Sequence, residues 1–177
     1  MIAIMSDWHV IFDGTPRRDL PDGEPLFLRQ EPVRSMFLVT SGTITLERSL
    51  PDGTGLTVHT AGAGRLLAEA SLFAETYHCD GIARGGARIA VMPRLRFLET
   101  LDAHPELARG LLADTAQEVQ SLRTRVEILR LRRLGDRLDA WLELYGKPGL
   151  GGWVRVADAI GVTPAALYRE LSRRRRP

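Results

Sequence analysis

Residues 105–131, PELARGLLADTAQEVQSLRTRVEILRL, carry the strongest periodic pattern in this sequence. Apolar side chains recur at steps of mostly three and four residues, and charged side chains fill the positions between them. Pro105 suits the first turn of a helix, and Glu106 complements the helix dipole there. The pattern therefore predicts one long amphipathic helix from Pro105 to Leu131.

The apolar seam of this helix is narrow, and a narrow seam is typical of a helix that packs on a partner helix. The sequence before it is rich in strand-like runs, and the sequence after it is short, helical and basic. We therefore expect a dimerisation helix that joins a sensing part to an acting part, although a helix packed only on its own domain is the alternative. The dimer seam is expected to consist of Leu112, Val119, Leu122, Val126 and Leu129.

Composition limits the class of protein. The chain has 177 residues, of which 44% are hydrophobic, so it can build a substantial core. No apolar run approaches the length of a membrane-spanning helix, and the first residues do not form a secretory signal, so we expect a cytoplasmic protein that does not interact with a membrane. Cys79 is the only cysteine, which excludes an internal disulfide, a Cys-only zinc site and a multi-cysteine iron–sulfur cluster within one chain. The formal net charge is +2, and residues 173–176 form a run of arginines that favours binding of a polyanion.

Short strand-like runs precede the long helix, at residues 26–28, 36–40, 43–46, 56–59 and 87–92. Ser41-Gly42 and Pro51-Asp52-Gly53 are expected to separate them as turns. Several short strands with such punctuation predict a small antiparallel roll or barrel. A short helix is expected at residues 93–101, and Gly135 is expected to act as a hinge after the long helix.

The last segment, residues 153–172, has the spacing of a helix-turn-helix. Ala157 is small where the two helices cross, and Gly161 permits a left-handed turn. Thr163 is a good N-cap and Pro164 a good first helical residue, so the second helix begins sharply. Such a helix can lie in the major groove of DNA, whereas a plain helical hairpin is the alternative.

The order of these parts resembles the Crp/Fnr family of bacterial transcription regulators. The resemblance rests on Phe37-Leu-Val-Thr-Ser-Gly42, Gly62-x-Gly64 and Glu69-Ala-Ser-Leu-Phe73, followed by the long helix and the helix-turn-helix. It implies an α+β chain with an antiparallel β-roll sensor of the double-stranded β-helix or jelly-roll type at residues 1–103. A dimerisation helix at 104–133 and a helix-turn-helix domain at 134–177 would follow.

The resemblance also implies how the carboxyl-terminal domain contacts DNA. Only Arg169 among the base-facing positions has the two-pronged geometry that reads guanine, and Ala165 can touch a thymine methyl. The family pattern continues into a small wing, which does not follow here, so we expect a helix-turn-helix lacking the usual wing, with weaker DNA binding. The implied base-facing residues are Pro164, Ala165 and Arg169, with Tyr168 next to them, and the implied phosphate contacts are Thr163, Ser172, Arg173 and Arg174.

In the sensor, the family binds a cyclic nucleotide with a Gly-Glu pair and an Arg-Ser or Arg-Thr pair. Glu69 occupies the glutamate position here, but Ala68 replaces the glycine, and Cys79 and Asp80 fall where the second pair is expected. A carboxylate at that place repels a phosphate, so we do not expect a cyclic nucleotide to bind in the usual way. The expected effector pocket consists of Leu67, Glu69, Ser71, His78, Cys79 and Asp80.

Several alternatives remain open at this stage. Some members of the family sense gases through haem, and His59, His78 and Cys79 are candidate iron ligands, although a lone cysteine is more often a small buried hydrophobe. The expected partners are double-stranded DNA, a second copy of the chain, a small-molecule effector and RNA polymerase. The rivals are a sensor whose carboxyl end binds a protein, and a cupin-like metalloenzyme. The scattered histidines disfavour the enzyme, so we expect a protein that is not an enzyme.

Overall fold

The computed structural model describes residues 7–50 and 55–175. The expected turn at residues 51–53 lies outside them. The chain divides into two compact units between Leu111 and Leu112, and each unit is described by itself below. No helix in the described part is long and apolar enough to cross a membrane.

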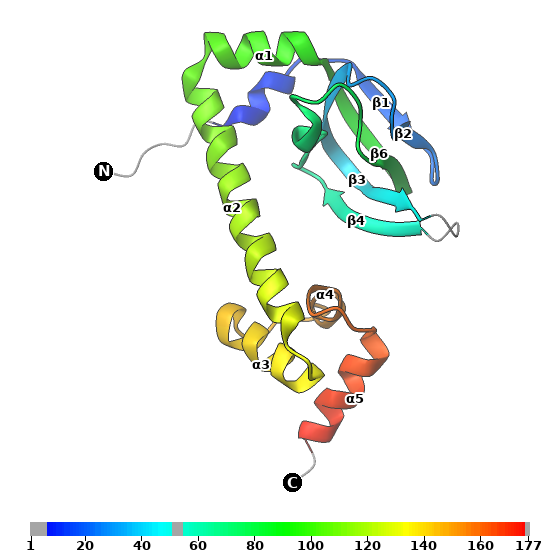
Figure 1. Cartoon of the computed structure of the whole chain (residues 1–177), viewed down its shortest axis with the longest axis vertical. Helices are drawn as coiled ribbons and strands as arrows, with labels where there is room; N and C mark the ends of the chain where they lie inside the picture. Colours follow the sequence, from blue (N-terminus) through cyan, green and yellow to red (C-terminus); the bar gives the residue numbers. More distant parts are fainter. Residues whose placement is uncertain (1–6, 51–54, 176–177) are drawn as a thin grey trace. The chain divides into compact units, whose positions relative to one another are not determined.

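The first unit is built on a sheet in which every described pairing is antiparallel (Figure 1). The strand order is β1-β6-β3-β4, with β2 paired to β6 and β5 paired to β3. This is the antiparallel β-roll expected from the sequence. Its strands are β1 (Arg17–Leu20), β2 (Pro25–Phe27), β3 (Ser35–Ser49), β4 (Gly55–Gly62), β5 (Leu66–Leu67) and β6 (Asp80–Pro93).

The two long strands β3 and β6 pair from Ser35 opposite Pro93 to Glu47 opposite Asp80. The expected turn at Ser41-Gly42 is wrong, because β3 runs through both residues with a local irregularity in its register. Gly42 has a φ of +79°, and a Cβ there would lie 2.2 Å from the carbonyl oxygen of Gly86. The glycine therefore allows a close approach between β3 and β6 rather than a reversal of the chain.

Aromatic side chains fill the core of the roll. The rings of Phe27 and Tyr77 stack with centroids 4.2 Å apart, and the ring of Phe37 stacks on Phe27 at 5.6 Å. Close to the first strands, the short 3₁₀ helix η1 (Trp8–Phe12) contributes buried apolar side chains, and Phe12 packs against Phe97 of α1 (Arg94–Ala103). The expected short helix at residues 93–101 is thereby confirmed as α1.

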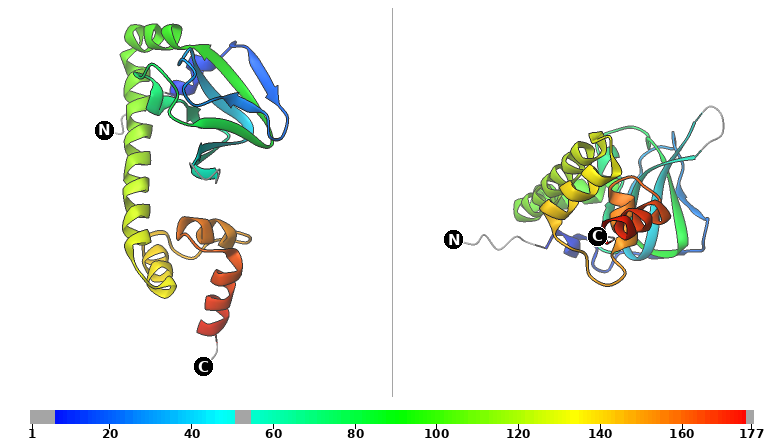
Figure 2. Two further views of the ribbon diagram at one scale, coloured as in Figure 1. Left: turned by 45° about the vertical axis from the view of Figure 1, so that its right-hand side comes forward. Right: turned by 90° about the horizontal axis from the view of Figure 1, so that it is seen from below.

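The predicted long helix is confirmed as α2 (Pro105–Arg130). The helices α3 (Leu134–Tyr145), α4 (Trp153–Ala159) and α5 (Pro164–Arg174) follow (Figure 2). The second unit has its own core, made of Ile128, Leu138, Val156, Ala157, Ile160 and Leu167. The expected hinge at Gly135 is wrong, because this residue lies inside α3, and the break between α2 and α3 falls at residues 131–133.

Candidate functional site

The structure brings most of the expected effector residues together in the segment between β5 and β6. The Ser71 hydroxyl and Nδ1 of His78 are 2.9 Å apart and share a hydrogen bond. The charges of Asp80 and Glu69 both act on the thiol of Cys79. The chain alternates here, with Cys79 buried and His78 and Asp80 half-buried, but β6 begins only at Asp80. The segment before it is therefore an irregular approach to the strand.

Ala68 connects this segment to the fully buried Leu67 of β5. It is buried and has φ +69° and ψ 11°, which is the left-handed region that favours glycine. An L-residue in this conformation costs about 1–2 kcal/mol. Ala68 thus adopts a conformation that favours glycine at the position where the family resemblance places a glycine. The short 3₁₀ helix η2 (Glu69–Ser71) follows directly.

Cys79 and His78 are not placed as a pair of accessible ligands for a metal ion. Cys79 is 1% exposed, and burial raises the pKa of its thiol, so that the thiol stays protonated at neutral pH. Burial, aided by the charge of Arg48, lowers the pKa of His78, so that this ring is neutral there. Within residues 7–50 and 55–175, no group of three or more His, Cys, Asp or Glu side chains is placed to hold a metal ion. The residues present do not fit a haem ligated by Cys79 and His78 in this conformation.

Arg48 contacts this segment, although the sequence patterns did not place it there. Its Nε donates a hydrogen bond to the carbonyl oxygen of His78 at 3.0 Å, and its charge acts on both His78 and Cys79. The alternation of residues in β3 indicates the position of Arg48, because Ile44, Leu46 and Arg48 share one face of the strand. Ile44 and Leu46 are buried, which places Arg48 at the exposed end of the core-facing row.

The helix-turn-helix of the second unit consists of α4, a tight turn and α5. Gly161 has a φ of +67°, and the N–H of Val162 donates to the carbonyl of Ala157 at 2.9 Å. Thr163 Oγ1 accepts a hydrogen bond from the N–H of Ala166 at 3.2 Å, which caps α5. The left-handed glycine and the N-cap predicted from the sequence are both confirmed.

The eight residues expected to contact DNA are all exposed on or next to α5. Ala165, Tyr168, Arg169 and Ser172 follow one another at steps of one, three or four residues, so they lie along one side of the helix. Tyr168 is 47% exposed, and the opposite side of α5 is anchored in the core by the fully buried Leu167. The exposed side thus combines one aromatic ring, one small residue and guanidinium groups.

Two arginines join the end of α2 to the helix-turn-helix, and neither contact follows from local spacing in the sequence. Arg137 donates to the carbonyl of Leu131 at 2.7 Å and to the carbonyl of Ile160 at 3.2 Å. Arg125 donates to the carbonyl of Asp158 at 3.0 Å. Both therefore satisfy carbonyl groups at helix ends, and they tie the last turns of α2 to the turn between α4 and α5.

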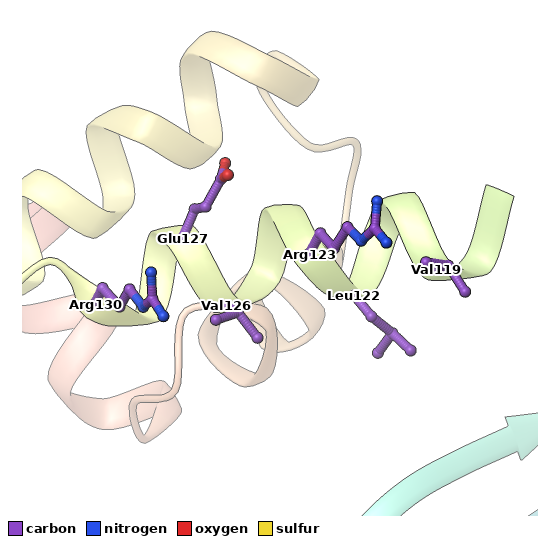
Figure 3. Close-up of a pocket in the computed structure, with 6 residues that line it drawn as sticks. All are labelled: Val119, Leu122, Arg123, Val126, Glu127 and Arg130. Carbon is purple, nitrogen blue, oxygen red and sulfur yellow. The ribbon is translucent and has the colours of Figure 1, made fainter. Parts of the chain in front are cut away.

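The lower part of α2 carries an exposed apolar face (Figure 3). Val119, Leu122 and Val126 project from one side of the helix, whereas Glu127 projects from the other. Their exposed fractions are 39%, 46% and 50%. Arg123 and Arg130 line the same shallow groove. Soluble monomers rarely leave a regular row of aliphatic side chains uncovered, so this face has the character of an unpartnered interface.

The remaining two residues of the expected seam differ from these three. Leu112 is 67% exposed, and it lies seven residues before Val119. Leu129 is half-buried, and a Cβ at Gly161 would lie 2.7 Å from its Cδ2 atom. Leu129 therefore packs on the helix-turn-helix of its own chain.

Comparison with known proteins identifies similar chains for both units. The protein-family model for the cyclic nucleotide-binding domain matches residues 17–104. The chain is 26% identical over 136 residues to the cyclic AMP receptor protein of Thermus thermophilus, a match that covers 76% of this chain and 63% of that relative. This chain thus spans less than two thirds of that protein's length.

Solved structures share the fold over nearly the whole chain. The c-di-GMP responsive global regulator CLP of Xanthomonas campestris has a TM-score of 0.64 at 17% identity, over 94% of this chain and 89% of that chain. FixK2 of Bradyrhizobium japonicum has a TM-score of 0.66 at 18% identity, over 90% of this chain and 83% of that chain. Both matches extend over the roll and the carboxyl-terminal helices.

Proposed function

Because this chain belongs to the Crp/Fnr family, we propose that it is a homodimeric, DNA-binding transcription regulator and not an enzyme. In this proposal, residues 1–103 form the sensor, 104–133 the dimerisation helix and 134–177 the DNA-binding domain. The observation that carries the proposal is the geometry of α5. This helix is capped at its start and anchored in the core on one side, and its exposed side presents Tyr168 and Arg169. A helix of this kind can insert its amino-terminal half into a major groove.

The charge distribution supports DNA as the partner. Residues 112–177 contain thirteen Lys or Arg and eight Asp or Glu, whereas residues 1–111 contain eleven and fourteen. The second unit therefore carries a net charge of +5 and the first a net charge of −3. Phosphate binding releases counterions only where cations gather, so a basic carboxyl-terminal unit fits the DNA-binding end.

Equilibrium binding to DNA tests the proposal directly. Fluorescence anisotropy with the duplex upstream of the protein's own gene, and with an unrelated duplex, should show preference for the upstream site and a steep dependence on salt. Arg169→Ala should lower affinity by about 1–3 kcal/mol for the preferred site and relax its sequence preference. Equal, weak binding to both duplexes would instead favour a carboxyl end that binds a protein partner.

The apolar face of α2 supports the homodimer. Leu112, Val119 and Val126 are spaced by seven residues, and Leu122 follows Val119 by three. Valine at the first and leucine at the fourth position of such a repeat favour a two-stranded parallel coil. Two recognition helices held in this way could reach half-sites about 34 Å apart.

A substitution on this face tests the dimer. Leu122→Glu should convert the protein to a monomer, because a carboxylate would be buried against its symmetry mate without a partner. Leu144→Glu is the matched control, because Leu144 is 58% exposed on α3 and lies outside the seam. Sedimentation velocity at micromolar concentration measures the outcome. An unchanged dimer in Leu122→Glu would place the interface elsewhere.

For the sensor, we propose an effector other than a cyclic nucleotide bound in the family manner. Asp80 stands where the family pattern has a phosphate ligand, and its Oδ1 already accepts a hydrogen bond from the N–H of Arg29 at 2.7 Å. The nearby cation is Arg48, which comes from β3. Addition of cyclic AMP or cyclic GMP should leave the unfolding temperature unchanged, because a ligand that binds the folded state must raise it.

A further inference from the structure

The carboxyl end of α5 is held on α3 by a cluster of charged groups. Nη1 and Nη2 of Arg174 contact both carboxylate oxygens of Asp139, and Nη2 also donates to the carbonyl of Gly135 at 3.0 Å. Nε of Arg174 donates to Oε1 of Glu170 at 2.8 Å. Each of the three nitrogens of this guanidinium thus has a hydrogen-bond partner within the protein.

Arg173 shares the same glutamate from the other side. Its Nε and Nη2 donate to the two oxygens of Glu170 at 2.8 and 2.7 Å. The Glu170 side chain is 12% exposed, and the two guanidinium groups lower the pKa of its carboxyl to about 2. The cluster contains two arginines and two carboxylates, so it is neutral as a whole and adds little to the basic surface.

Gly135 lies directly against this arrangement. A Cβ there would lie 3.4 Å from Nη2 of Arg174 and 3.5 Å from Oε1 of Glu170. The Arg174 side chain is 29% exposed, whereas that of Arg173 is 72% exposed. The two neighbouring arginines are therefore placed differently, although the sequence presents them as one run.

We propose that Arg174 is a positioning residue, which fixes the recognition helix α5 on α3 through Asp139 and Glu170 and does not bind a DNA phosphate. This inference rests on the proposed DNA-binding function, and it removes Arg174 from the phosphate contacts implied by the family resemblance. To reach a phosphate, Arg174 would have to give up two carboxylates and a carbonyl, which would leave Asp139 without its arginine and Glu170 with Arg173 alone. Among the described residues, Arg169, Arg173 and Arg175 are other exposed cations of this end.

The test uses the full chain with Arg174→Gln, Arg174→Lys, Asp139→Asn, the double variant Arg174→Gln/Asp139→Asn, and Arg175→Gln as the matched control. Anisotropy is measured on the upstream duplex and on an unrelated duplex at several salt concentrations. Asp139→Asn is the most informative variant, because removal of an acidic group strengthens DNA binding if only net charge matters. If Arg174 and Asp139 clamp α5 onto α3, loss of this clamp in Asp139→Asn should instead weaken binding to the preferred site.

A positioning role predicts that Arg174→Gln and Asp139→Asn each weaken the preferred site on the order of threefold to tenfold, with no further loss in the double variant. Arg174→Lys should behave like Arg174→Gln, because lysine keeps the charge but lacks the planar fork. The salt slope should stay unchanged in all of them, whereas Arg175→Gln should reduce it by about one.

Tighter binding by Asp139→Asn, wild-type binding by Arg174→Lys, or a slope reduced by Arg174→Gln would overturn the proposal. If the wild-type protein binds neither duplex, the proposed function fails, and the clamp is then tested by unfolding in denaturant. Non-additive losses of stability for the 139 and 174 variants would support the clamp, and additive losses would contradict it.

Discussion

Two residues with left-handed backbone, one in each compact unit, show how differently the chain treats its two candidate sites. Ala68 in the effector segment has φ +69°, and Gly161 in the helix-turn-helix has φ +67°. At Gly161 a Cβ would lie 2.7 Å from Cδ2 of Leu129, whereas Ala68 accommodates its methyl group in the core of the roll at 5% exposure. The turn of the helix-turn-helix therefore needs glycine for space as well as for conformation, and the turn at Ala68 has space but bears backbone strain.

The difference between the two turns follows from the contacts that each turn makes. The turn of the helix-turn-helix lies against Leu129 of α2 and is tied to it through Arg137. A change there would move α5 relative to α2. The segment between β5 and β6 keeps a left-handed residue at Ala68, whereas Cys79 and Asp80 stand where the family resemblance places the phosphate ligands. The backbone geometry of the helix-turn-helix is thus more tightly constrained than the side-chain chemistry of the segment between β5 and β6.

The largest expected effect is that of Gly161→Ala. The left-handed conformation costs an alanine about 1–2 kcal/mol, and the contact with Leu129 adds about 1 kcal/mol of overpacking, so the free energy of unfolding should fall by about 2–3 kcal/mol. Denaturant unfolding followed by circular dichroism measures this loss.

Gly151→Ala is the matched control for Gly161→Ala. Gly151 has a φ of +75°, but a Cβ there would meet no atom within 4 Å. Only the conformational cost should remain, which is about 1–2 kcal/mol. If both variants lose the same stability, then Leu129 moves aside at no cost, and the spatial difference between the two turns disappears.

The second prediction concerns Ala68→Gly. Relief of strain gains about 1–2 kcal/mol, while loss of a buried methyl costs about 0.8 kcal/mol and the added chain entropy about 0.5–1 kcal/mol. The net change should therefore lie near zero. Ala90→Gly should instead lose about 1.5 kcal/mol, because Ala90 is fully buried on β6 in an ordinary backbone conformation. Equal losses in the two variants would show that Ala68 is not strained.

Sequence patterns predicted those features whose cause is local. Thr163 and Pro164 define the start of α5, and the apolar period defines α2, because capping and helical spacing act within a few residues. The pattern failed at Ser41-Gly42, where pairing with β6 carries β3 through a turn-like dipeptide. At Gly135 it failed because that glycine serves contacts with a helix much later in the chain.

The contacts that the sequence patterns did not predict share a cause. Arg48 reaches the carbonyl of His78 across 30 positions of sequence, and Arg174 reaches Asp139 across 35. Arginine within a basic run, or at the exposed end of a strand, is the residue least informative about its partner, because its long side chain can also extend into solvent. Contacts of this range depend on the folded arrangement of the strands and helices, which local spacing does not specify.

The smallest expected effect contrasts the two units in acid. Burial lowers the pKa of His78 below 6.5, so the unfolded chain takes up a proton there first, and stability falls as the pH drops below 6.5. Glu170 acts over a lower pH range. Because the pKa of its carboxyl is depressed, the stability that it contributes is present above pH 4.5 and is lost as the pH falls toward about 2.

His78→Asn separates these contributions, because an amide can keep a hydrogen bond with Ser71 but cannot titrate. Between about pH 7.5 and about pH 5.5, wild type should lose slightly more stability than His78→Asn, whereas Glu170→Gln should run parallel to wild type. Denaturant midpoints at the two pH values measure both. Parallel behaviour of His78→Asn and wild type would mean that protonated His78 is solvated without cost, and the effector segment would then be open to water rather than closed over its histidine.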